Sequence, residues 1–299
     1  MKNPVFALAS LAGVLHVSAN PVPLPIATNV CRFDEHPDAA GHLEAATSLS
    51  KRQSSWSPPS NLVTPLQEVW DHQMSTYSDP LGFKNYGYDQ IMANEGYLNF
   101  CVRWESSQPV TAAQRADVEA ALQQSVKKWM DKLVGFEGFP YSSVPVKVVG
   151  WAVSSTSLLQ GDTSGIDVYT TKDAEGIPEC DPRCGRFFHQ DGNYASCPGG
   201  AARHYDQSLW LTEGFEGGAG GDWGQRIGRS YFMDNLNADS IHILLHEIGH
   251  TFALDDFYDW TPTGLTNFIM LAGSSSVITE FDFWMMRDWW RNLKSRYGL

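Results

Sequence analysis

The stretch 246-HEIGHTFALDD-256 carries the most informative pattern in this 299-residue sequence. On a helix, His246 and His250 lie one turn apart and project from the same side. Two imidazoles placed in this way can bind one zinc ion, each at about 2.0–2.1 Å from it. Glu247 directly follows the first histidine, so it lies beside a zinc-bound water without being a ligand, as a general base must. The pattern therefore predicts a helix that carries a catalytic zinc site.

A catalytic zinc ion usually has three protein ligands and one open position for water, so a third ligand is required. In the extended pattern His-Glu-x-x-His-x-x-Gly-x-x-His, Asp256 stands at the position of the third histidine, and aspartate oxygen is an established zinc ligand. We rank Asp256 first, with Asp255, Asp259 and the distant Glu280 as alternatives. Ala253 stands at the glycine position, where a left-handed turn is unfavourable for a residue with a Cβ atom. The sequence thus leaves open how the chain turns after the helix.

These residues resemble the metzincin-type zinc endopeptidases, and are most similar to those with aspartate as third ligand, such as the snapalysin-like secreted proteases of bacteria. The chain also resembles a set of secreted fungal proteins. Met270, in 268-FIMLAG-273, fits the methionine-containing turn that metzincins place beneath the zinc ion, and Tyr297-Gly298 fits the end of their last helix. The resemblance covers roughly residues 95–299, and its specific motif lies within residues 246–273.

The resemblance implies a metzincin-like fold of the α+β class. We expect a twisted mixed sheet with an amphipathic backing helix, the active-site helix, and a short C-terminal subdomain that ends in a helix. It also implies a monomeric endopeptidase with one catalytic Zn²⁺, which hydrolyses protein or peptide substrates with Glu247 as base. Two alternatives remain: a non-catalytic protein that binds cellulose or cell-wall carbohydrate through exposed tryptophans, and a zinc hydrolase that acts on a non-peptide bond.

The N-terminus carries two processing signals. Residues 1–19 combine a lysine, a short apolar run and small residues at their end, which is typical of a secretory signal peptide. The dibasic pair Lys51-Arg52 ends a Pro- and Ala-rich segment, so we interpret residues 20–52 as a propeptide. The protein is therefore expected to be secreted, with residues 53–299 as a single catalytic domain.

Within that domain, we expect an upper subdomain of about residues 90–253 and a lower one of about residues 254–299. The following elements are predicted: an irregular lead-in over 53–90, strands over 97–104, 144–153, 165–169 and 208–211, helices over 111–133 and 277–297, a cysteine-rich loop over 171–207 and a flexible glycine-rich loop over 214–228.

The cysteines fit the secretory route. The catalytic domain has four, Cys101, Cys180, Cys184 and Cys197, and an even number in an oxidising environment predicts two disulfides, with three pairings open. Cys31 lies in the propeptide. Its thiolate, a strong zinc ligand, is a candidate to close the open metal position and to make the propeptide an inhibitor, as in the cysteine switch of matrix metalloproteases. The alternative is a plain unpaired cysteine.

The net charge of −13 argues against nucleic acid or an anionic membrane surface as a partner. No apolar run in the sequence reaches the length that a membrane-spanning helix requires.

Overall fold

The computed structural model describes residues 55–299. The expected signal peptide, the expected propeptide with Cys31, and the expected start of the catalytic domain at residue 53 lie outside this range. Within it, no helix is long and apolar enough to cross a membrane.

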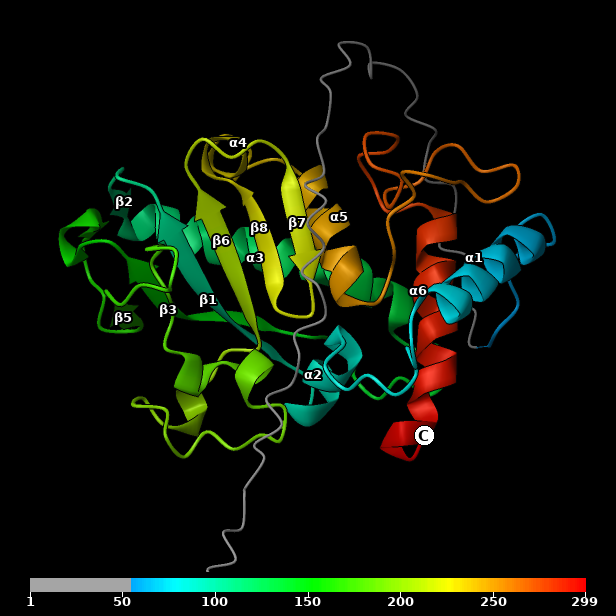
Figure 1. The fold of residues 1–299 in the computed structure, drawn as a ribbon, viewed down its shortest axis with the longest axis horizontal. Helices are drawn as coiled ribbons and strands as arrows, with labels where there is room; N and C mark the ends of the chain where they lie inside the picture. The colour runs from blue at the N-terminus through cyan, green and yellow to red at the C-terminus, as the bar shows by residue number, and fades with distance from the viewer. Residues whose placement is uncertain (1–54) are drawn as a thin grey trace, which may run out of the picture.

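A six-stranded, mostly parallel sheet forms the centre of the fold, in the order β5-β3-β1-β6-β8-β7 (Figure 1). The edge strand β7 runs antiparallel to β8, and the other neighbours are parallel. The strands of this sheet are β1 (Leu98–Glu105), β3 (Val146–Val153), β5 (Asp167–Tyr169), β6 (Gln207–Thr212), β7 (Gly218–Gly221) and β8 (Gly224–Gly228); β2 (Val110–Thr111) pairs with β4 (Leu159–Gln160) in a small second sheet. The expected mixed sheet is confirmed.

Within residues 55–299, six α-helices accompany the sheet, and short 3-10 helices lie in the connections and directly after α6. The α-helices are α1 (Val63–Thr76), α2 (Gly87–Ala93), α3 (Ala112–Leu133), α4 (Arg229–Asp234), α5 (His242–Thr251) and α6 (Glu280–Leu293); the 3-10 helices are η1 (Thr156–Leu158), η2 (Pro182–Cys184), η3 (Arg186–Phe188), η4 (Ala201–Arg203) and η5 (Lys294–Tyr297). The protein is therefore a mixed α/β structure.

Helix α3 is the helix expected over 111–133, and it begins with a capping box. Thr111 Oγ1 accepts a hydrogen bond from Gln114 N at 3.2 Å, and Gln114 Oε1 accepts one from Thr111 N at 3.0 Å. The apolar face of α3 contacts β3 and the helix α5. The indole of Trp129 on this face donates to Leu245 O at 2.9 Å, which ties α3 to α5.

Two predictions about irregular segments are wrong. The lead-in contains α1 and α2, because Leu66, Val69 and Gln73 form a buried stripe on α1 that the surrounding polar residues and prolines obscured. The glycine-rich run is not a flexible loop, because it forms the hairpin β7–β8. Gly224 illustrates the reason: a Cβ atom there would lie 2.0 Å from Ser208 O on the neighbouring strand, so glycine permits close strand packing.

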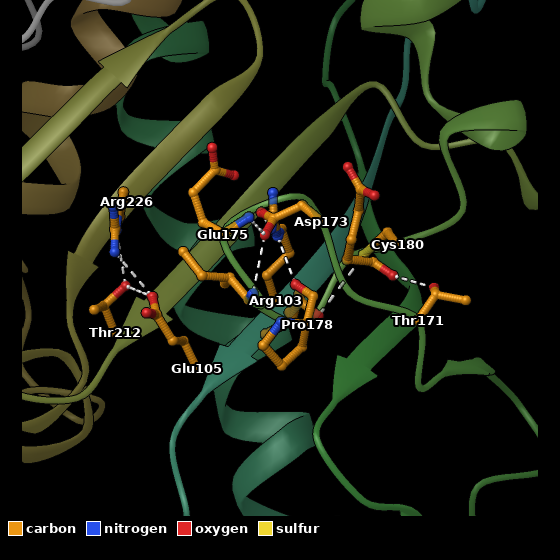
Figure 2. A network of polar contacts seen from close by, with 12 residues as sticks. Arg103, Glu105, Thr171, Asp173, Glu175, Pro178, Cys180, Thr212 and Arg226 are labelled. Atoms are coloured by element: carbon orange, nitrogen blue, oxygen red, sulfur yellow. Dashed lines mark hydrogen bonds and ion pairs between the residues drawn. The ribbon is translucent and has the colours of Figure 1, made fainter.

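Disulfides join Cys101 to Cys180 and Cys184 to Cys197, as expected in number. Cys101 lies on β1, so the first bridge attaches the cysteine-rich loop to the sheet. Arg103, two residues further along β1, pairs with Asp173 of this loop, and its Nε donates to Pro178 O at 2.7 Å (Figure 2). The loop is therefore held by a covalent bond and a partly buried ion pair together.

We predict that the two disulfides differ in their contribution to stability. Cys101–Cys180 spans 79 residues and Cys184–Cys197 spans 13, and a bridge that closes a longer loop removes more entropy from the unfolded chain. Replacement of both cysteines by alanine should lower the free energy of unfolding by about 4 kcal/mol for the first pair and about 3 kcal/mol for the second. Urea denaturation of the two double variants measures this, and a larger loss for the Cys184–Cys197 pair would contradict it.

Candidate metal centre

Helix α5 brings the two histidines of the motif together. The Nε2 atoms of His246 and His250 are 3.2 Å apart. Each Nδ1 faces a backbone carbonyl: His246 Nδ1 lies 2.7 Å from Ile269 O, and His250 Nδ1 lies 2.8 Å from Leu254 O. Because a carbonyl oxygen only accepts, each Nδ1 carries the proton and donates, and Nε2 is the acceptor nitrogen. Both rings are thus held in the tautomer that binds a metal through Nε2.

Asp256 completes the cluster. Its Oδ1 lies 3.1 Å from His246 Nε2 and 3.5 Å from His250 Nε2. Ligands at zinc distance on a tetrahedron are separated by about 3.3 Å, so the three atoms have the spacing that one zinc ion requires. Burial raises the pKa of Asp256, and the two imidazoles lower it by more when they carry positive charge, so the net shift of its pKa is downward. The ionised carboxylate is the form that binds a metal.

The alternative carboxylates occupy other positions. Asp255 Oδ1 accepts hydrogen bonds from the Tyr77 hydroxyl at 2.9 Å and from Asp256 N at 3.0 Å. Asp259 is exposed, and so is Glu280 at the first residue of α6. Among these acidic residues, the structure places Asp256 against both imidazoles.

The chain turns after α5 with Ala253 in the left-handed conformation, at φ 64°. Gly249 O accepts hydrogen bonds from Phe252 N at 3.0 Å and from Leu254 N at 3.2 Å, which closes the helix end. The open question from the sequence is thereby answered: alanine adopts the glycine-type turn, although a left-handed residue with a Cβ atom costs about 1–2 kcal/mol.

Glu247 is fully buried beside the histidines, with Oε2 3.8 Å from His250 Nε2. Its carboxylate occupies space that two glycines of β7 provide. A Cβ atom on Gly218 would lie 2.1 Å from Glu247 Oε1, and one on Gly220 would lie 2.9 Å from Oε2. The glycine-rich edge strand is therefore part of the site, a role that the sequence pattern did not suggest.

Met270 packs against α5 at Gly249. It is fully buried. A Cβ atom on Gly249, the glycine within HEIGH, would lie 2.3 Å from Met270 Sδ, so glycine at this position lets the thioether pack against the helix backbone.

Asp282 is a site residue that sequence reasoning missed. Fully buried on α6, it accepts hydrogen bonds from Ile269 N at 2.9 Å and Met270 N at 3.2 Å, and burial raises its pKa. It thereby holds the segment whose carbonyl, Ile269 O, accepts from His246 Nδ1. The sequence signal was the capping box Thr279-x-x-Asp282, in which Thr279 N donates to Asp282 Oδ2 at 2.8 Å.

Removal of the Asp282 carboxylate should weaken the whole fold. In Asp282→Ala, the amides of Ile269 and Met270 lose their buried acceptor, and each such loss costs about 1–3 kcal/mol. We therefore expect the free energy of unfolding to fall by at least about 2 kcal/mol in urea denaturation. Glu280→Ala is the matched control, because Glu280 is exposed on the first turn of the same helix. Equal stability of the two variants would contradict the anchoring role.

No protein-family model matches the sequence, and a search of curated proteins found no relative. The function is therefore inferred from the chemistry and geometry of the residues themselves.

Proposed function

We propose that this chain is a secreted zinc-dependent endopeptidase with a metzincin-like site. The observation that carries the proposal is the triangle of His246 Nε2, His250 Nε2 and Asp256 Oδ1, whose sides are 3.2, 3.5 and 3.1 Å. Glu247 is buried directly beside this triangle. Two imidazoles and one carboxylate are a donor set that suits catalytic zinc and leaves one position open for water.

The chain's own groups supply the proton transfers of peptide hydrolysis. When bound, zinc would lower the pKa of a coordinated water to about 7 and polarise the scissile carbonyl. Glu247 accepts a proton from the water that attacks the carbonyl carbon. It then delivers this proton to the amine nitrogen as the C–N bond breaks. Asp256, His246 and His250 would hold the ion, and Met270 would form the floor beneath them.

The edge strand supports a peptide as substrate. β7 lies at the edge of the sheet and packs against α5 (Figure 1). An extended peptide can add to such an edge through main-chain hydrogen bonds. The sequence of β7 is Gly-Ala-Gly-Gly, so its side chains do not obstruct a close backbone approach. This arrangement favours peptide hydrolysis over the action of the same zinc chemistry on a non-peptide bond.

Other observations support secretion and weaken the carbohydrate-binding alternative. The two disulfides are typical of proteins that fold in an oxidising compartment. All eleven tryptophans lie within the described residues, and none of them is exposed. A sugar-binding platform requires exposed aromatic rings, so the eleven indoles do not provide one in this structure.

Glu247→Gln should separate metal binding from catalysis. The substitution preserves side-chain size but removes the base, so casein hydrolysis should fall by about 10²–10⁴-fold. Zinc stoichiometry, measured by atomic absorption, should stay at one ion per chain. Glu216→Gln, at an exposed site before β7, should behave as the wild type. Wild-type hydrolysis by Glu247→Gln would contradict the proposed role.

Asp256→Asn should identify the third ligand. Residues that merely orient a ligand are worth about 10–100-fold in metal affinity, so loss of the ligand itself should weaken zinc binding by more than about 100-fold. The matched control is Asp259→Asn, three residues later and exposed, for which we expect unchanged affinity. Competition with a chromogenic zinc chelator measures both, and undiminished zinc binding by Asp256→Asn would disprove the assignment.

A further inference from the structure

We propose that helix α1, the first helix of the described residues, helps to position the metal centre, and that Gln73 is the residue through which it positions the ligands. The inference rests on the proposed zinc site and adds a positioning element that lies far from the motif in sequence. Its basis is a set of contacts between α1 and the loop that carries Asp256.

Side chains of α1 and its C-cap contact this loop at four places along residues 253–263. Gln73 Nε2 donates to Ala253 O at 2.9 Å, the Tyr77 hydroxyl donates to Asp255 Oδ1 at 2.9 Å, His72 lies against Trp260 with ring centroids 4.4 Å apart, and Glu68 accepts from Thr263 N and Thr263 Oγ1, both at 2.7 Å. Glu68 and His72 thus contact the C-terminal part of this loop, and Gln73 and Tyr77 contact its N-terminal part, so α1 lies along the loop that carries Asp256.

Gln73 donates a hydrogen bond to the backbone of the turn at Ala253, which lies between His250 and Asp256. Its side chain is buried, with 2% exposed. Nε2 donates to Ala253 O, while Oε1 accepts from the Trp289 indole on α6 at 2.8 Å. Because both ends of the amide are bound, it cannot rotate without losing a hydrogen bond. The carbonyl that accepts from Gln73 Nε2 belongs to Ala253, the residue in the unfavourable left-handed conformation.

The position of Ala253 explains how this contact reaches the metal. Ala253 lies midway between His250 and Asp256, three residues from each. The next residue, Leu254, provides the carbonyl to which His250 Nδ1 donates. A change in the turn would therefore rotate the His250 ring and displace Asp256 at the same time. Gln73 thus positions two of the three proposed ligands across a separation of 180 residues from Ala253.

Tyr77 reinforces the far side of the same loop. Asp255 Oδ1, which accepts from the Tyr77 hydroxyl, also accepts from Asp256 N at 3.0 Å. Burial and the neighbouring Asp255 carboxylate raise the pKa of Tyr77, so its hydroxyl remains a donor at neutral pH. Through Asp255, this contact restrains the backbone amide of Asp256.

The test measures zinc affinity of the full-length chain. In Gln73→Met, which preserves side-chain length but loses the amide, the zinc dissociation constant should rise by about 10-fold, the scale found for groups that orient ligands. The matched control is Gln67→Met on the same helix, where the amide is exposed and bonds Asp71 at 2.8 Å. Its dissociation constant should equal that of the wild type. Competition with a chromogenic chelator measures both values.

A second substitution separates positioning from general stability. Glycine adopts a φ of about 60° without the penalty that alanine incurs, so the turn no longer requires Gln73 to hold it. Ala253→Gly in the Gln73→Met background should therefore return the dissociation constant to within about 3-fold of the wild type. A helix that only contributes packing would not show this rescue. Unchanged affinity in Gln73→Met, or a loss that Ala253→Gly does not relieve, would overturn the proposal.

Two further measurements keep the result interpretable. If Gln73→Met does not fold, Tyr77→Phe replaces it: loss of the exposed hydroxyl should weaken zinc binding by about 3-fold, the size of one modest hydrogen bond, and unchanged affinity would overturn the proposal. Zinc binding by the wild type without casein hydrolysis would disprove the peptidase function alone. Absence of zinc binding by the wild type would overturn the function and the inference together.

Discussion

Two hydrogen bonds from imidazole to backbone carbonyl organise the candidate site. His246 Nδ1 donates to Ile269 O and His250 Nδ1 donates to Leu254 O, and together they set the tautomer and the direction of both rings. The Ile269 carbonyl belongs to a segment that Asp282 of α6 holds through its amides. The Leu254 carbonyl follows the turn at Ala253, to which Gln73 of α1 donates a hydrogen bond. Gln73 also accepts a hydrogen bond from Trp289 of α6. Both carbonyls therefore depend on α6, the last α-helix of the chain.

The site also depends on glycines whose role is spatial. In the edge strand β7, Gly218 and Gly220 leave room for the buried carboxylate of Glu247, and within α5, Gly249 leaves room for the thioether of Met270. A side chain at any of these positions would overlap a group of the proposed machinery. The left-handed turn is the opposite case, because Ala253 occupies a conformation that suits glycine better. The hydrogen bonds from Gln73 to Ala253 O and from His250 to Leu254 O offset the conformational cost of this alanine.

Local patterns predicted the parts of the fold that depend on neighbouring residues. The helix predicted over 111–133 corresponds to α3, and the four predicted strands correspond to β1, β3, β5 and β6. Predictions failed where distant residues decide the structure. Helix α1 was missed because its buried stripe is short and includes Gln73, a polar residue whose partners lie on α6 and beyond α5. The hairpin β7–β8 was missed because glycine has low strand propensity and only the packing against α5 and β6 makes it favourable.

The sequence by itself determined that the two histidines share one face of a helix and that the glutamate lies next to the first of them. Their spacing is a local property, because an α-helix has a period of 3.6 residues. It also determined that four cysteines would form two bridges. Only the tertiary structure decided which carboxylate joins His246 and His250, which cysteines pair, and whether Ala253 turns as a glycine would. Each of these depends on contacts between segments far apart in the chain, whose distances and hydrogen bonds arise from packing and are not encoded in any local spacing.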